Sequence, residues 1–152
     1  MTEASNDGVV RRYLAAHKAH DFDAIGRLRH PDWTTEWPQS QERVRGDAND
    51  RAIMEHWPAG MPTALDEVRV VGAEDRWVMT PSFTVARVIG DGDHWWFEGT
   101  ASYADGSVWY VIGLMQLRDR QLFRETWYFS PPLPAPDWRS AWVERTEPPP
   151  PG

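Results

Sequence analysis

The chain has 152 residues, enough for one domain with a sizeable hydrophobic core. Its net charge of −7 and its single lysine argue against a nucleic-acid partner, because phosphate binding relies on clustered basic residues. Cysteine is absent, which excludes disulfides, thiolate catalysis and cysteine-ligated metals, and no apolar run approaches the ~18 residues that a membrane helix needs. We therefore expect a cytoplasmic protein without a membrane partner.

Ten tryptophans are the most unusual feature of the composition. Tryptophan is costly to leave exposed, and it offers a large flat surface with one N–H donor. Two interpretations stay open: the residues fill a core, or several of them line a cavity or a subunit interface.

The N-terminal part of the chain predicts two helices after a loose leader over residues 1–6. Apolar residues at helical spacing predict the first helix over about 7–19, where His17 is expected at the edge of the core. Asp21 is a candidate cap for a second, shorter helix, which His30-Pro31 ends because a residue before proline avoids the helical region.

Alternation predicts a short strand over 32–38 that places Trp33 on one side and acidic residues on the other. Residues 39–46 are expected to form a polar connection, followed by a third helix over about 47–57 that ends with His56 and Trp57. His56 is either a residue of the cavity mouth or an ordinary exposed histidine at a helix end. Further strands are expected over 66–74, beginning at residue 76, and over 83–89.

The stretch from His94 to Phe129 predicts three antiparallel strands joined by two-residue turns at Asp105-Gly106 and Asp119-Arg120. That register sets Phe97 opposite Leu114 and Leu114 opposite Glu125. One face then holds Trp95, Phe97, Tyr103, Tyr110, Ile112, Leu114, Phe123, Glu125, Trp127 and Phe129. The other face, with Trp96, Trp109, Met115, Leu122 and Tyr128, is too apolar for solvent, so we predict a homodimer through it. A slip of one residue would exchange the faces.

Beyond this meander, consecutive prolines over 131–136 predict an extended segment. Asp137 is expected to cap one or two helical turns carrying Trp138 and Trp142, which dock onto the domain or onto a neighbouring subunit. The single domain is expected to span 7–142, and the proline-rich tail over 143–152 to be disordered.

Four segments of the chain carry a family resemblance. They are the segments 19–25, His30-Pro31-Asp32-Trp33 with its continuation to Gly46, 117–122 and 124–129. Together with the order of the expected elements, they resemble the SnoaL-like branch of the nuclear transport factor 2-like superfamily. The resemblance implies an α+β fold in which a cone-shaped, curved, mainly antiparallel sheet wraps around N-terminal helices, with an apolar cavity at one end.

Members of this superfamily include ketosteroid isomerases, polyketide cyclases, epoxide hydrolases of the limonene type and non-catalytic binding proteins. Its enzymes commonly place an aspartate on the cavity face of the last strand, and the matching position here is Trp127. Glu125 lies on the same face two residues earlier and is the nearest substitute.

Glu125 among aromatic residues would be poorly solvated, which raises its pKa and suits proton transfer. The alternative is a structural glutamate that is paired with an arginine or points to the rim. Tyr110 and Tyr103 are candidate hydrogen-bond donors to a substrate, although simple packing also explains them. The expected walls of the cavity are Trp95, Phe97, Leu114 and Trp127, with Trp33, His56 and Trp57.

The sequence thus predicts a cavity protein for a small, hydrophobic, planar organic molecule. It is either an isomerase, cyclase or hydrolase that works by general acid–base chemistry without a cofactor, or a non-catalytic binding or interaction protein. The histidines show no metal-ligand spacing, and no phosphate loop or dinucleotide fingerprint occurs, so no metal and no cofactor are expected.

Overall fold

The computed structural model describes residues 5–56, 82–102 and 108–147. The elements in chain order are α1 (Asn6–Ala19), α2 (Phe22–Leu28), β1 (Arg29–Trp37), β2 (Glu42–Arg45), α3 (Asp47–Glu55), β3 (Ser82–Asp91), β4 (His94–Ser102), β5 (Val108–Arg118), β6 (Gln121–Ser130) and the 3-10 helix η1 (Asp137–Trp142). The strands expected within 66–80, and the residues Trp57 and Tyr103, lie outside the described residues. No helix in the described ranges is long and apolar enough to cross a membrane.

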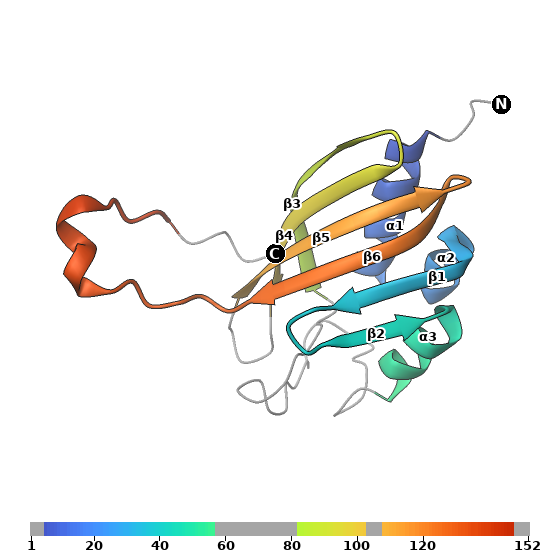
Figure 1. The fold of residues 1–152 in the computed structure, drawn as a ribbon, viewed down its shortest axis with the longest axis horizontal. Coiled ribbons are helices and arrows are strands. Elements are labelled where there is room, and N and C mark those ends of the chain that lie inside the picture. Colours follow the sequence, from blue (N-terminus) through green and yellow to red (C-terminus); the bar gives the residue numbers. More distant parts are fainter. Residues whose placement is uncertain (1–4, 57–81, 103–107, 148–152) are drawn as a thin grey trace.

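The three predicted helices form, and side chains cap the starts of the first two, whereas Asp137 does not cap the segment after the meander. The Ser5 hydroxyl accepts a hydrogen bond from the Gly8 amide at 3.2 Å, and the Asp21 carboxylate accepts one from the Ala24 amide at 2.9 Å. Figure 1 shows α1 behind the sheet, which leaves the front face of the strands uncovered by helices. The face against α1 is called the inner face below, and the opposite one the outer face.

The six strands of the described residues form one sheet in the order β2-β1-β6-β5-β4-β3, and among these strands only β1 and β6 run parallel. This mainly antiparallel curved sheet with N-terminal helices confirms the predicted α+β cone. The expectation of a polar connection over 39–46 is wrong, because Glu42–Arg45 pairs with β1 as an edge strand. Val44 turns inward and is buried while its charged neighbours face solvent, which is the alternation of a strand with one covered face.

The first hairpin of the meander is shifted by one residue from the predicted register. Phe97 lies opposite Gly113 rather than Leu114, and Ser102 pairs with Val108 across residues 103–107. Because the register differs by one residue from the predicted one, every side chain of β5 lies on the opposite face from the one predicted. Tyr110 and Leu114 therefore lie on the outer face, 45% and 47% exposed, and their predicted place in the cavity wall is wrong.

The second hairpin has the predicted turn but also a bulge. Asp119 and Arg120 both adopt positive φ, at 51° and 59°, as a two-residue hairpin turn of this kind requires. Gln116 pairs with Arg124 while Leu117 pairs with Leu122, so Phe123 is an extra residue on β6. This second shift cancels the first, and the inner face of β6 carries Glu125 and Trp127 as predicted.

The corrected register also changes the predicted interface. Met115 and Leu122 are buried in the core, and Trp109 packs against it. The outer face instead carries apolar side chains in a continuous area, which we call the apolar stripe: the exposed Ile89, Tyr110, Ile112, Leu114 and Tyr128, with the half-buried Trp96.

The segment after β6 projects from the body of the molecule as an arm over residues 131–147 (Figure 1). Trp138 and Trp142 on η1 are 75% and 79% exposed, and no residue of η1 is buried. The expectation that this segment docks back onto its own domain is therefore wrong. Its prolines explain the arm, because they keep the backbone extended and deny it a place in the sheet.

Candidate functional site

Glu125 lies on the inner face of the sheet, next to Thr35 of β1, and only 3% of it is exposed. Each of its carboxylate oxygens accepts a hydrogen bond from an indole. Trp33 Nε1 donates to Oε1 at 3.2 Å, and Trp127 Nε1 donates to Oε2 at 2.8 Å. Two strands and two aromatic rings thus fix the orientation of this carboxylate.

A second layer of polar groups connects Glu125 to the helices. The Tyr13 hydroxyl hydrogen-bonds to Glu125 and accepts a hydrogen bond from Arg29 Nε at 2.9 Å. The Arg29 guanidinium also lies 3.6 Å from the ring centre of Trp33. On its other side, Nη1 lies 2.8 Å from Oδ1 of Asp47 and 2.8 Å from Oδ2 of Asp50. The result is a connected network of charged groups, buried except for the half-exposed Asp47, that runs from α3 to β6.

Burial is the dominant influence on the acidic groups of this network. It raises the pKa of Glu125, opposed by the charge of Arg29 and by hydrogen bonds from Tyr13, Trp127 and Trp33. Burial likewise raises the pKa of Asp50, with Arg29 opposing it, and raises the pKa of the Tyr13 hydroxyl, with Glu125 adding to the effect. Glu125 thus holds its proton more tightly than an exposed glutamate does, as a group that exchanges protons near neutral pH requires.

His17 adds a neutral ring to this site. Burial, followed by the charge of Arg29, lowers the pKa of His17 to about 3, so the imidazole is uncharged at neutral pH. Its ring meets that of Tyr13 edge-on at 4.6 Å between centres and lies 5.6 Å from that of Trp127.

Thr35 supplies a further polar atom beside Glu125. This residue is 3% exposed, and its hydroxyl has no hydrogen-bond partner among the described residues. A buried hydroxyl without a partner costs free energy, which a polar atom of a bound molecule or a water would recover.

The sequence profile of the SnoaL-like domain matches residues 10–101. The chain belongs to the SnoaL-like family. Its structure resembles that of an NTF-2 like protein of unknown function from Burkholderia xenovorans LB400, with 32% identity, coverage of 93% of this chain and 95% of that one, and a TM-score of 0.70.

Two further structures support the fold alone. A putative ketosteroid isomerase from Kribbella flavida DSM 17836 gives a TM-score of 0.73 at 18% identity, covering 93% of this chain and 90% of that one. A hypothetical protein with a ketosteroid isomerase-like fold from Catenulispora acidiphila DSM 44928, in complex with trimethylamine, gives a TM-score of 0.55 at 17% identity, covering 80% of this chain and 85% of that one. The comparison with curated protein sequences finds no match.

The SnoaL-like fold brings together some of the predicted site residues and separates others. Trp33 and Trp127 contact Glu125, and Phe97 packs edge-on against Trp127 at 5.0 Å between ring centres. Trp95 is half-buried at the border of the core, with its indole N–H bonded to the Gly92 carbonyl at 3.0 Å. Tyr110 and Leu114 lie on the other side of the sheet.

His56 does not join this cluster either. It is exposed at the end of α3, and its Nδ1 lies 2.8 Å from the Ala52 carbonyl oxygen. The described structure therefore favours the interpretation of His56 as an ordinary histidine at a helix end. Among the described residues, no group of histidine and carboxylate side chains has an arrangement that would hold a metal ion.

The polar partners of Glu125 on the helical side were not among the predicted site residues. Tyr13 and His17 lie four residues apart on the buried stripe of α1, and this polar pair on an apolar face is the signal that the sequence contained. Arg29 and Asp50 left no such signal, because charged residues are almost always exposed unless they are paired.

Proposed function

We propose that this protein binds a small, hydrophobic, planar organic molecule and transfers a proton on it without a cofactor, as an isomerase, cyclase or hydrolase does. Glu125 is the acid/base. The observation that carries the proposal is a carboxylate with a raised pKa, buried among aromatic side chains and oriented by two indoles. Tyr13 hydrogen-bonds to Glu125 itself and helps to orient the acid/base, whereas Tyr110 lies on the outer face and is not part of the proposal.

The network supports both protonation states that such a reaction needs. Ionised Glu125 is stabilised by the charge of Arg29 and by hydrogen bonds from Tyr13 and the two indoles. In the proposed step, Glu125 takes a proton from a C–H bond next to a carbonyl group and returns it to another atom of the same molecule. No proton, electron or cofactor is consumed. Because the His17 ring is neutral, the positive charge beside Glu125 comes from Arg29.

The second candidate function is binding without catalysis. Both oxygens of Glu125 already accept hydrogen bonds from the protein, which is also what a structural carboxylate does. In addition, Trp127 occupies the position at which enzymes of the family commonly hold an aspartate.

An exchange experiment separates the two candidates before the substrate is known. Planar aromatic ketones are screened for binding through tryptophan fluorescence, and bound compounds are incubated with the protein in D2O. We expect deuterium to enter an acidic C–H position, and Glu125→Gln to slow this exchange about 100-fold or more. Glu98→Gln on the outer face is the matched control, because Glu98 is 39% exposed and pairs only with Arg87 among the described residues. Binding without exchange would select the second candidate, and no binding at all contradicts both.

We also propose a homodimer in which two copies pack their apolar stripes together. Ile112 pairs across strands with Tyr128, and Leu114 with Trp96, so the exposed side chains form one area rather than scattered sites. Light scattering after gel filtration tests this: we expect a dimer that Leu114→Asp converts to a monomer. A wild-type monomer would contradict the proposal.

The arm over 131–147 belongs to the same proposed assembly. It leaves β6 at Ser130, which pairs with Tyr110 of the apolar stripe, so each arm starts at the border of the proposed interface. We propose that Trp138 and Trp142 pack on the second copy. Their fluorescence should shift to longer wavelength when Leu114→Asp separates the subunits.

A further inference from the structure

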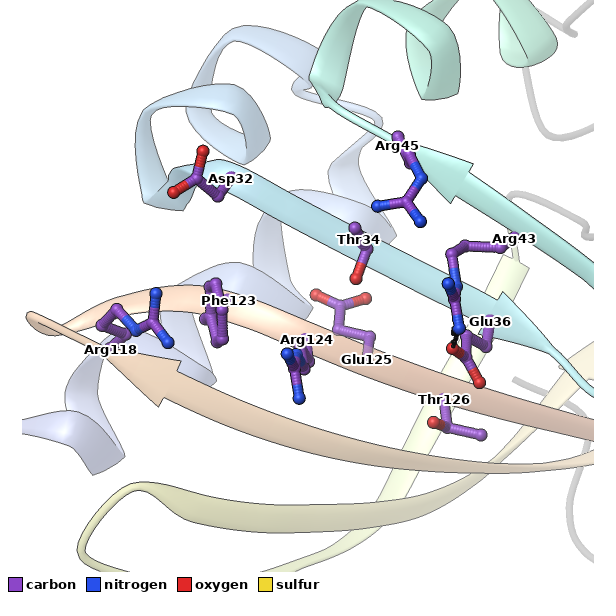
Figure 2. A pocket seen from close by; sticks show the side chains of 10 residues that line it. All are labelled: Asp32, Thr34, Glu36, Arg43, Arg45, Arg118, Phe123, Arg124, Glu125 and Thr126. Atoms are coloured by element: carbon purple, nitrogen blue, oxygen red, sulfur yellow. Dashed lines mark hydrogen bonds and ion pairs between the residues drawn. The ribbon is translucent and has the colours of Figure 1, made fainter.

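The outer face of the sheet carries a groove that the proposed function does not use. Its volume is about 710 Å³, and it spans β2, β1, β6 and the end of β5. The residues that line it are Asp32, Thr34, Glu36, Arg43, Arg45, Arg118, Phe123, Arg124, Glu125 and Thr126 (Figure 2). Glu125 is only 3% exposed, and its carboxylate is bonded to Trp33 and Trp127 on the inner side.

The groove originates in an irregular pairing of β1 with β6. Arg29 pairs with Leu122 and Thr34 with Arg124, so β1 advances five residues where β6 advances two. Pro31 lies in this part of β1 and has no N–H for a ladder hydrogen bond. The two strands therefore part here, and the bulge residue Phe123 is among the residues that line the groove.

Arginines surround this hollow in a fixed arrangement. Arg45 and Arg124 both pair with Thr34, so guanidinium, hydroxyl and guanidinium follow one another across three strands. The two arginine backbones are two strand spacings apart, about 10 Å, which their side chains can bridge toward one ligand. Two guanidinium groups also lie over the ring of Phe123, that of Arg118 at 3.5 Å and that of Arg124 at 5.0 Å from the ring centre.

The groove has an excess of positive charge in an acidic protein. Arg43 is paired with Glu36, with Nε 2.9 Å from Oε1. Arg45, Arg118 and Arg124 make no ion pair with a carboxylate in the described part of the chain. Their planar N–H edges suit carboxylate and phosphate oxygens, which guanidinium groups bind in pairs.

We propose that this groove binds a small organic anion, whose carboxylate or phosphate lies over Thr34 between Arg45 and Arg124. The volume is in the range of sites for organic ligands rather than for a single inorganic ion. Thr34, Arg45 and Arg124 lie on the opposite side of the sheet from the carboxylate of Glu125, so the proposed anion site does not depend on the proposed function.

Titrations with inorganic phosphate and with phthalate, a rigid aromatic dicarboxylate, test the proposal at constant ionic strength, with chloride as the reference anion. Binding is followed by calorimetry and by NMR of the arginine Nε–H groups. We expect at least one probe to bind with a dissociation constant below about 1 mM, which is ordinary for small-ligand sites. Tighter binding of phthalate would indicate a carboxylate ligand, and tighter binding of phosphate a phosphate ester.

Variants locate the binding. The double variant Arg45→Gln/Arg124→Gln should weaken the better probe at least tenfold, and Thr34→Val should weaken it while both arginines remain. Arg11→Gln on the exposed face of α1, where Arg11 pairs with Asp7, is the control and should change nothing. The proposal is overturned if neither probe binds more tightly than chloride, or if the double variant binds as the wild type does.

Discussion

Replacing Trp127 by phenylalanine removes one of the two indole donors to Glu125 and keeps an aromatic ring in its place. The Trp127 N–H lies 2.8 Å from Oε2, whereas Trp33 serves Oε1 at 3.2 Å. The hydrogen bond from Trp127 favours the ionised form and lowers the pKa of Glu125 against the effect of burial. The variant should therefore raise the pKa of Glu125 further.

The size of the effect follows from the strength of the lost bond. A hydrogen bond to a charged group contributes about 1.5–3 kcal/mol. Because 1.36 kcal/mol corresponds to a tenfold change, the proton affinity of Glu125 should rise about 10- to 150-fold. Trp33→Phe should produce a smaller rise, since its bond is longer.

Carbon-13 NMR of the glutamate carboxyl groups measures this change, with the Glu125 signal assigned by its absence in Glu125→Gln. Trp95→Phe is the control, because its indole N–H donates to the Gly92 carbonyl and the ring change is the same. If the proton affinity of Glu125 rises less than twofold in Trp127→Phe, the indole does not control this carboxylate, and the electrostatic argument for the site fails.

Three further variants probe the interior. Gly113→Ala should destabilise the fold by about 1–3 kcal/mol in thermal unfolding, because its Cβ would lie within 2.9 Å of three ring atoms of Phe97. The control Gly8→Ala has room for a Cβ and should leave the stability unchanged or raise it. Arg29→Met should cost about 3–5 kcal/mol in urea unfolding, because two buried carboxylates lose their counter-charge. His17 has a pKa lowered to about 3, so the unfolded chain binds its proton first and stability falls as pH drops below about 6.5. Between pH 6 and 4, the free energy of unfolding of the wild type should fall by about 1.4 kcal/mol per pH unit more than that of His17→Phe. If the free energy of unfolding of both proteins has the same slope against pH, a buried neutral His17 is contradicted.

The helices and the second turn of the meander were predictable because their signals are local. Ser5 and Asp21 cap helices within three residues of themselves, and the turn at Asp119-Arg120 forms where it was predicted. The register was not predictable, because it depends on the length of the first connection and on the bulge at Phe123. Glu125 was placed on the correct face only because these two one-residue shifts cancel.

The residues of the candidate site were predictable where they follow from side-chain alternation along a strand, and not where they depend on long-range contacts. Trp33 and Trp127, which donate hydrogen bonds to Glu125, stand at inward-facing positions of strands with alternating side chains. The alternation along each strand therefore identified both residues. The contact between Trp33 and Glu125 nevertheless joins residues 92 positions apart, and no local rule gives that pairing. Arg29 is harder still, because its burial depends on carboxylates from α3 and a hydroxyl from α1 that only the folded chain assembles.

One irregularity in β1 accounts for features on both faces of the sheet. Arg29 and Trp33 lie four residues apart on β1 and both are buried, and the guanidinium of Arg29 lies 3.6 Å from the indole ring centre. The departure of β1 from β6 falls between Arg29 and Thr34, beside this contact on the inner face, and the arginine-lined groove lies over the same stretch on the outer face. A change that restored regular pairing there would close the groove and also draw Arg29 away from Trp33. The two sites, although chemically separate, therefore depend on the same stretch of backbone.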